Sequence, residues 1–221
     1  MIRLRRRTLI ASTAAAALLP LPGFAQAPAR YAFAVVRGGD PMGTHTIDIA
    51  QAGDRTEVAI AIDLAVKFGP LTVFRYTHRN REVWQGGRLL ALETTTDDDG
   101  TPHKVSAQAT QQGLQVSGSG GSYLAPADTL PSSYWRPETV TRTVLLNTQE
   151  GVLSKVAFAP VAQESVPVAG RPVPAARHRM SGDIEGDLWY DAAGRWVALQ
   201  FSARGSDVVY TLNTDPAPVG L

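Results

Sequence analysis

Glu-Val-Ala-Ile-Ala-Ile-Asp-Leu-Ala-Val, residues 57–66, is the stretch that decides the fold of this chain. Large apolar side chains alternate here with small or charged ones, and the large ones are Val58, Ile60, Ile62, Leu64 and Val66. Successive side chains of a β-strand point to opposite faces of its sheet. The alternation therefore predicts a strand with one face in the core and the other toward solvent.

Outward from this stretch, turn residues separate further strands of the same period. The turns that we expect are Gly38–Pro41, Gly53-Asp54, Gln85–Gly87, Asp98–Gly100 and Ala192–Arg195. Strands that recur about every ten residues between Gly-rich turns are typical of antiparallel sheets, sandwiches and barrels. We therefore predict an all-β fold, a single-domain curved antiparallel sheet that forms a half-barrel or a partly closed barrel.

The strand pattern fails at residues 118–131, and two further segments interrupt it. Residues 166–174 hold three prolines and a glycine, which predicts a loop. Residues 138–149 fit either a short helix or a strand. Neither segment shows a long helical period, so the all-β prediction is unchanged.

The first 27 residues differ in kind from the rest of the chain. Four arginines at positions 3, 5, 6 and 7 precede an apolar, Ala-rich run at residues 9–21, and Ala25-Gln26-Ala27 has the form of a cleavage site. This order is typical of a secretory signal peptide. We therefore divide the chain into a signal peptide, residues 1–27, and a single β domain, residues 28–221, with cleavage after Ala27.

The signal predicts a soluble protein in the periplasm or outside the cell. Arg6-Arg7-Thr8-Leu9-Ile10 also fits the twin-arginine pattern, so the general secretory route and the twin-arginine route both stay open. The chain has no cysteine, which excludes disulfides and a lipid-modified cysteine. No apolar run after the signal approaches the length that crosses a bilayer, so we expect no transmembrane anchor in the mature chain.

The charge of the mature chain argues against a nucleic-acid partner. Without the four arginines of the signal, 17 of the 21 basic residues remain against 20 acidic ones, a net charge of −3 instead of the whole-chain +1. Domains that bind nucleic acids carry a basic patch or stripe, and anionic membrane surfaces attract clusters of basic residues. A mildly acidic chain supports neither partner.

No residue pattern marks a metal or cofactor site. The four histidines, His45, His78, His103 and His178, lack the spacing of zinc ligands. The run Asp97-Asp98-Asp99-Gly100 lacks the alternating ligands of a calcium loop and fits a hairpin turn instead. We expect neither a metal nor a cofactor.

The motifs of common enzyme classes are also missing. The Gly/Ser-rich run at residues 117–122 has no closing Gly-Lys-Ser/Thr and so is not a phosphate loop, and it contains no Gly-x-Ser-x-Gly elbow. Thiol chemistry is excluded because there is no cysteine. The sequence favours a protein that is not an enzyme, and a hydrolase that assembles distant His and Asp residues remains the alternative.

Aromatic residues in strands and beside turns are the better candidates for a binding site. Our candidate ligand-binding residues are Phe74, Tyr76, Trp84, Trp135 and Trp189, which are large aromatics outside the 57–66 strand. Trp189 and Tyr190 are neighbours on a predicted strand and so point to opposite faces. The alternative is that these aromatics fill the core and stiffen the sheet.

Several of these residues carry a resemblance to a known family. The motifs are Tyr31–Val35, Gly39–His45, Glu82–Trp84 with Gly87–Leu89, Thr96–Gly100, Ser133–Trp135, Asp187–Asp191 and Gly194–Val197. In these motifs, which span almost the whole mature chain, the sequence resembles the exported proteobacterial family of domain of unknown function 6134. The resemblance implies no activity, because that family has none established.

The last part of the chain is also similar to a related, broader exported family of unknown function. Gly151, Glu164 and Gly170 precede the Trp189 hairpin in a comparable order. That resemblance implies a half-barrel like those of lipoprotein carriers, a cradle for an acyl chain or an extended peptide.

Three classes of function stay open on the sequence alone. The first is non-enzymatic binding of an apolar ligand, such as a lipid, or of an extended peptide, by a soluble periplasmic protein. The second is the periplasmic hydrolase. The third is a structural module that binds another envelope protein at a sheet edge.

Overall fold

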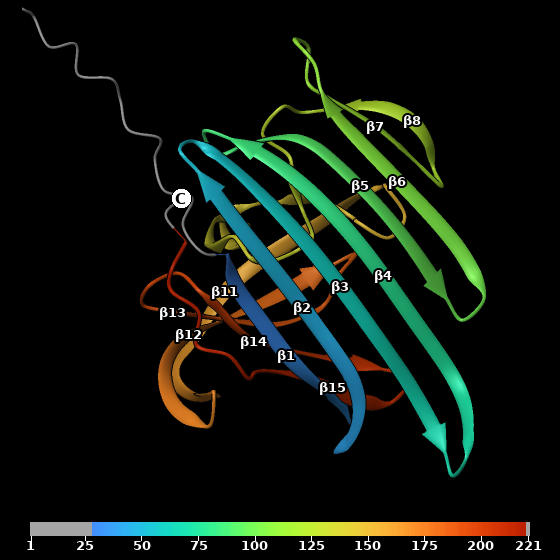
Figure 1. Ribbon diagram of the computed structural model, residues 1–221, viewed down its shortest axis with the longest axis vertical. Helices are drawn as coiled ribbons and strands as arrows, with labels where there is room; N and C mark the ends of the chain where they lie inside the picture. The colour runs from blue at the N-terminus through green and yellow to red at the C-terminus, as the bar shows by residue number, and fades with distance from the viewer. Residues whose placement is uncertain (1–27, 220–221) are drawn as a thin grey trace, which may run out of the picture.

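The computed structural model describes residues 28–219, whose strands form a curved 15-stranded sheet (Figure 1). The predicted signal peptide and its cleavage site lie outside the described residues. The strands are β1 Ala29–Arg37, β2 Asp40–Ala52, β3 Arg55–Phe68, β4 Leu71–Gln85, β5 Arg88–Asp98, β6 Thr101–Ala109, β7 Leu114–Gly118, β8 Gly121–Ala125, β9 Leu130–Pro131, β10 Val144–Leu146, β11 Leu153–Val168, β12 Arg171–Gly182, β13 Gly186–Asp191, β14 Trp196–Ala203 and β15 Ser206–Leu212.

The order of strands across the sheet is β8-β7-β6-β5-β4-β3-β2-β1-β15-β14-β13-β12-β11-β10-β9. Chain neighbours therefore pair almost throughout, and the first and last strands, β1 and β15, pair in the middle of the sheet. All pairs are antiparallel except β9 with β10, which is parallel. The prediction of an all-β fold built on a curved antiparallel sheet is confirmed.

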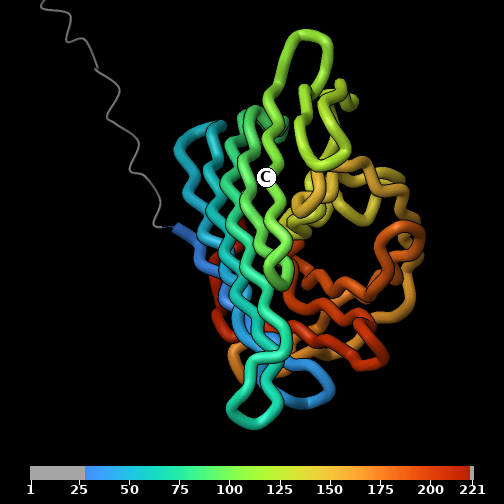
Figure 2. The backbone as a smooth tube through the Cα atoms, turned by 90° about the vertical axis from the view of Figure 1, so that its right-hand side faces the viewer, coloured from blue at the N-terminus to red at the C-terminus, as the bar shows by residue number. Residues whose placement is uncertain are grey.

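The sheet curls toward a barrel, but no continuous ladder of strand hydrogen bonds joins its two edges among the described residues (Figure 2). Residues 126–152, which we call the crossing segment, hold β9, the short 3-10 helix η1 Pro137–Thr141, and β10. The crossing segment meets the first half of the sheet through single hydrogen bonds. Thr94 Oγ1 donates to the Thr148 carbonyl at 2.7 Å, and Tyr123 OH donates to the Gly151 carbonyl at 2.9 Å. Isolated bonds in place of a ladder leave the barrel partly closed.

The tight turns fall where their glycines predict them. Gly86 and Gly87 have φ of 53° and 80°, and Asp99 and Gly100 have φ of 52° and 90°. Two successive residues with positive φ match the right-handed twist of the flanking strands and favour Gly and Asp. Asp97 Oδ1 also accepts the Gly100 N–H at 2.7 Å, so the acidic run serves a hairpin turn, as predicted.

The prediction of a loop at residues 166–174 is wrong. β11 and β12 form one long hairpin through this region, and Pro167 lies opposite Pro172. Proline removes a backbone donor and is tolerated only where no neighbouring strand needs that donor. The pairing of β12 with β13 covers only Ala175–Met180, so Pro172 and Pro174 lie in a part of β12 that has no strand on its other side. Residues 138–149 contain both of the alternatives, in η1 and β10.

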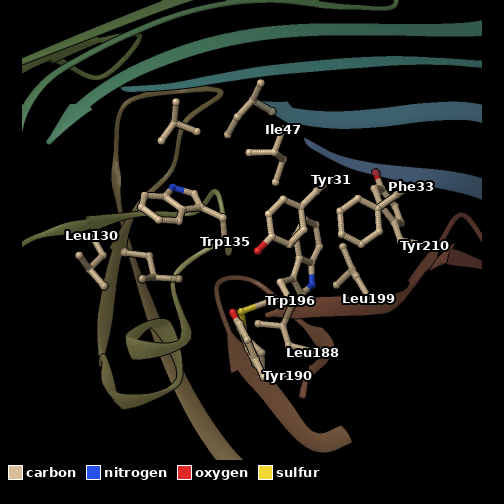
Figure 3. Close-up of a cluster of buried hydrophobic side chains, with 14 of the residues drawn as sticks. Tyr31, Phe33, Ile47, Leu130, Trp135, Leu188, Tyr190, Trp196, Leu199 and Tyr210 are labelled. Carbon is tan, nitrogen blue, oxygen red and sulfur yellow. The ribbon is translucent and has the colours of Figure 1, made fainter. Parts of the chain in front are cut away.

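The core lies on the concave side of the sheet (Figure 3). Phe33 of β1 packs against Trp196 of β14 with ring centroids 4.3 Å apart, and Tyr134 of the crossing segment meets Trp196 at 5.9 Å. Tyr190 donates its hydroxyl proton to the Tyr134 carbonyl at 2.7 Å. These contacts join the middle of the sheet, its second half and the crossing segment.

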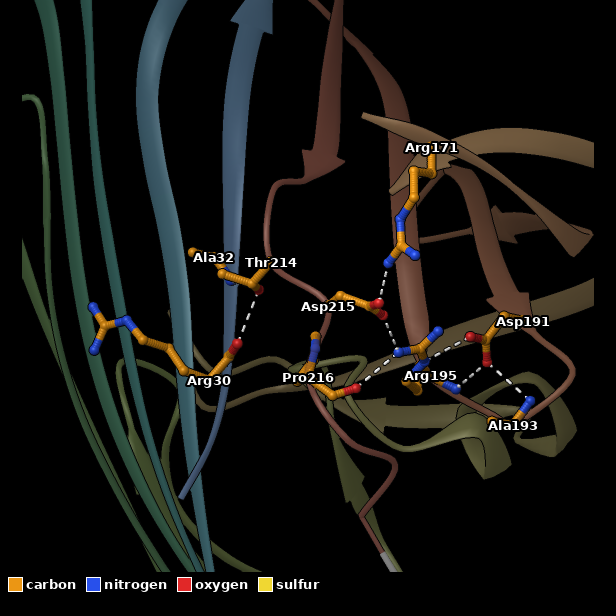
Figure 4. A network of polar contacts seen from close by, with 9 residues as sticks. All are labelled: Arg30, Ala32, Arg171, Asp191, Ala193, Arg195, Thr214, Asp215 and Pro216. Atoms are coloured by element: carbon orange, nitrogen blue, oxygen red, sulfur yellow. Dashed lines mark hydrogen bonds and ion pairs between the residues drawn. The ribbon is translucent and has the colours of Figure 1, made fainter. Parts of the chain in front are cut away.

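The segment after β15 is tied back to the sheet (Figure 4). Thr214 Oγ1 accepts the backbone N–H of Ala32 at 3.0 Å. Asp215 pairs with Arg195 at 2.7 Å and also with Arg171. The described residues contain no helix long and apolar enough to cross a bilayer.

A candidate ligand cavity

Two adjoining cavities open into the concave side of the sheet. The inner cavity has a volume of about 260 Å³. It is lined by strands β2, β3, β4, β12, β14 and β15, by the connection between β12 and β13, and by the crossing segment. The outer cavity has a volume of about 520 Å³. Both are lined by Ile62, Tyr76, Gln149, Phe201 and Tyr210, so they share one wall.

The outer cavity lies at the end of the molecule where three hairpins meet, β1–β2, β3–β4 and β14–β15. Its apolar lining includes Leu64, Val66, Val73 and Phe74. The positively charged side chains in its lining are Arg37, beside the first hairpin, and Arg204, in the third hairpin. The guanidinium of Arg204 lies 5.1 Å from the centre of the Phe74 ring. At the tip of the second hairpin, Phe68 and Leu71 are 79% and 64% exposed.

A short chain of hydrogen bonds marks the junction of the two cavities. Tyr76 OH donates to Gln149 Oε1 at 3.1 Å, and Gln149 Nε2 donates to Asp98 Oδ2 at 3.2 Å. Burial raises the pKa of the Tyr76 hydroxyl, so it stays protonated. Gln149 belongs to the crossing segment, and these bonds therefore fix that segment against β4 and β5.

The inner cavity holds buried polar atoms that have no partner. His45, on β2, is 5% exposed and packs against Phe33, Trp196 and Tyr210. Neither of its ring nitrogens has a hydrogen-bond partner, and neither has Oδ1 of Asn80. Burial lowers the pKa of His45 to about 3, helped by His78, so the ring is neutral near pH 7.

His78 is the second histidine of the inner cavity. Its Nδ1 lies 2.7 Å from Thr96 Oγ1, and burial, followed by the charge of Arg79, lowers its pKa to about 4. Glu185 also lines this cavity. Because His45 has no partner at all, no carboxylate orients it as a general base. The described residues contain no cluster of three or more His, Asp or Glu side chains arranged for a metal.

Two of the five predicted binding residues line the cavities. Tyr76 lines both, and Phe74 lines the outer one. Trp84, Trp135 and Trp189 are not among the residues that line either cavity, and they are 1%, 5% and 7% exposed. The structure therefore brings Phe74 and Tyr76 together at one site and places the three tryptophans elsewhere.

Trp84 and Trp135 pack edge to face, with ring centroids 5.6 Å apart, around the buried carboxylate of Glu82. Both indole N–H groups donate to Glu82 Oε2 at 2.9 Å. Asn80 Nδ2 donates to the other oxygen, Oε1, at 2.8 Å. Burial raises the pKa of Glu82, against the hydrogen bonds that lower it. We call these four residues the Glu82 cluster.

Arg136 covers the Glu82 cluster from outside. Its guanidinium lies 4.8 Å from the Trp84 ring centre and 5.6 Å from that of Trp135. Here Trp84 borders a separate depression of about 360 Å³. The positively charged side chains that line this depression include Arg136 and Arg142.

Trp189 lies on the other face of β13 from Tyr190. Its indole N–H donates to Glu164 Oε1 at 2.7 Å, and the Arg177 guanidinium lies 5.2 Å from its ring centre. Tyr190 points the other way, to the Tyr134 carbonyl. Both faces of β13 are therefore covered.

His45 and Asn80 were missed as site residues by the sequence reasoning. Asn80 follows Phe74, Tyr76 and His78 in the same alternation, so its place on their face was available as a signal. No such signal places His45 at the site. His45 pairs with Ile62 on β3, and Ile62 pairs with His78 on β4, so only the register of these three strands brings His45 into line with His78.

Comparison with known families agrees with the fold. The model of the domain of unknown function DUF6134 matches residues 33–213. The chain belongs to the DUF6134 family. No curated protein matches it. A solved structure, described as a β-barrel-like protein of the domain of unknown function DUF1849 from Brucella abortus, is similar to it in fold.

That similarity has a TM-score of 0.55 at 9% sequence identity, and it covers 87% of this chain and 97% of the other. At this identity the similarity supports the β-barrel-like fold alone.

Proposed function

We propose that this DUF6134 protein binds an apolar ligand in the two adjoining cavities and is not an enzyme. The observation that carries the proposal is the outer cavity of about 520 Å³, with its mainly aliphatic and aromatic lining. Ligand sites are typically concave, mostly apolar and supplied with a few polar groups. Arg37, Arg204 and Asp98 are such groups here.

The residues of the inner cavity support binding over hydrolysis. A nucleophile needs a base that is itself oriented by a third group. His45 has no partner, and His78 contacts the hydroxyl of Thr96. Among the described residues, β11 pairs only with β12 over residues 157–168, and this free edge lines neither cavity. The apolar lining of the outer cavity favours an apolar small molecule over an extended peptide. The signal-like residues 1–27 support a periplasmic site of action.

Fluorescence of the neutral apolar probe N-phenyl-1-naphthylamine tests the proposal. We expect saturable binding with a blue shift, because the probe leaves water for an apolar cavity. Ala203→Trp places a large ring in the lining of the outer cavity and should weaken binding at least roughly tenfold through steric exclusion. The matched control, Ala59→Trp, makes the same change at an exposed position of β3 and should bind normally.

Two results would overturn the proposal. The first is the absence of saturable binding by the unmodified protein. The second is equal binding by Ala203→Trp and Ala59→Trp, which would place the probe outside the cavity. Thermal melting of both variants shows that each is folded before binding is compared.

A further inference from the structure

Most of the unpartnered polar atoms of the described residues belong to two side chains of the inner cavity. Five buried side-chain nitrogen or oxygen atoms have no hydrogen-bond partner, and three of them belong to His45 and Asn80. Both residues line the inner cavity. Buried polar groups are hydrogen bonded in the great majority of cases, so each exception needs an explanation.

The chemistry of these atoms defines what they can bind. The neutral His45 ring offers one N–H donor and one nitrogen acceptor. Asn80 offers its carbonyl oxygen, because its amide nitrogen already donates to Glu82. Between them lie the apolar side chains of Ile60 and Ile62, which also line the cavity. The inner cavity therefore presents both a donor and acceptors, in a wall that also carries Ser132, Ser133 and Thr148.

The charges around the two cavities differ. No lysine or arginine lines the inner cavity, whereas Glu185 does. Arg37 and Arg204 line the outer cavity. Burying an ionised group without an opposite charge is strongly unfavourable. A carboxylate or phosphate would therefore avoid the inner cavity, whereas a neutral group with both donors and acceptors would satisfy it.

We propose that the inner cavity is a subsite for the neutral, hydrogen-bonding head group of an aliphatic ligand, such as a primary amide or a hydroxyl. The head group bonds His45 and Asn80, and the hydrocarbon chain extends past Tyr76 into the outer cavity. This inference rests on the proposed function and specifies its ligand class.

Displacement of N-phenyl-1-naphthylamine by two ligands with one chain length tests the subsite. Decanamide has a neutral head with donors and an acceptor, and decanoate at pH 8 has an ionised one. We expect decanamide to displace the probe at a concentration roughly tenfold lower, the difference that one or two buried hydrogen bonds give. This comparison needs only the unmodified protein, so it does not depend on the folding of any variant.

A histidine substitution then locates the effect. His45→Phe keeps an aromatic ring against Phe33, Trp196 and Tyr210 but removes both nitrogens. Its affinity for the probe is measured first, and the ratio of the decanoate to the decanamide concentration that displaces the probe should then fall toward one. The control His103→Phe changes a half-exposed residue of β6 that lines neither cavity, and it should keep the full preference.

The outcomes separate the two proposals. If decanamide and decanoate displace the probe equally, or if decanoate is the stronger, the subsite is wrong, whereas the apolar cavity still binds. If His45→Phe keeps the preference, His45 is not part of a subsite. If the unmodified protein binds no probe, the proposed function itself fails, and the subsite with it.

Discussion

The two ends of β4 carry aromatic residues on the same face of the sheet, yet the ends differ in what covers that face. Phe74 and Tyr76 lie near its start and line the cavities. Trp84 lies near its end and is 1% exposed, packed against Trp135 of the crossing segment. One alternation thus lines a cavity at one end and a sealed core at the other.

The division continues on the neighbouring strand. On β3, Val58 and Ile60 are buried, whereas Ile62 and Val66, on the same face, are only half-buried. Ile62 lines both cavities and Val66 lines the outer one. The cavities therefore extend across neighbouring strands at the same end of the sheet. They end where the crossing segment packs against the sheet.

Removal of the Trp135 side chain tests the sealed end and should have the largest effect. Trp135→Ala leaves a void beside Trp84 and removes one N–H donor from Glu82. We expect the free energy of unfolding to fall by about 3–5 kcal/mol, as for other buried Trp-to-Ala changes. Chemical denaturation measures this loss. A loss below about 1 kcal/mol would mean that the crossing segment does not seal this end.

Acid should destabilise the protein through the cavity histidines. Burial lowers the pKa of His45 to about 3 and that of His78 to about 4, from 6.5. The unfolded chain therefore takes up protons below pH 6.5 that the folded chain refuses, so stability is full above 6.5 and falls as the pH drops toward the folded pKa values. At about pH 4.5, each histidine should cost about 2–3 kcal/mol of stability.

His45→Phe isolates one of these contributions. The variant should lose less stability than the unmodified protein between pH 6.5 and 4.5. The raised pKa of Glu82 acts in the opposite sense, since a carboxyl with a raised folded pKa loses stability as the pH rises. The comparison of variants cancels that contribution. Identical acid profiles for His45→Phe and the unmodified protein would contradict the burial of a neutral His45.

Glu82→Gln tests whether the sealed end depends on a carboxylate. Glu82 accepts N–H groups at both oxygens, so either orientation of a glutamine amide turns an NH₂ group toward a donor. We expect a loss of about 1–3 kcal/mol in the free energy of unfolding, the cost of unsatisfied buried polar groups. The control Glu57→Gln, exposed and paired only with Arg55 among the described residues, should change stability by less than about 0.5 kcal/mol. Equal effects would show that Glu82 makes no special contribution.

Local pattern was enough to predict the sheet. The alternation at residues 57–66 and the glycines of the hairpins depend on neighbouring residues only, and the strands and turns that they predict are present. The prolines at residues 166–174 misled because their cost depends on whether another strand lies alongside, and β13 ends before it reaches them. That information belongs to the topology, not to the segment.

The site was predictable in part for the same reason. By alternation, Phe74, Tyr76 and Trp84 all lie on the same face of β4. The residues near Trp84 give no sign that a segment some fifty residues later in the chain covers Trp84. His45 lies on another strand and joins the cavity only through the register of β2 with β3. Sequence thus predicts which side chains face inward, and the crossing segment determines which of those line a cavity.

The smallest effect on stability is expected at the open end of β4. Phe74 is half-buried in the outer cavity, so Phe74→Ala should lower the free energy of unfolding by less than about 1 kcal/mol, since little new cavity is created. It should weaken binding of N-phenyl-1-naphthylamine at least about threefold, because an aromatic surface of the lining and its contact with Arg204 are lost. The control Leu124→Ala, at a 46% exposed position of β8, should change neither quantity. If Phe74→Ala instead destabilises the protein as strongly as Trp135→Ala and leaves binding unchanged, then both ends of β4 are core, and the distinction between a sealed end and an open end is lost.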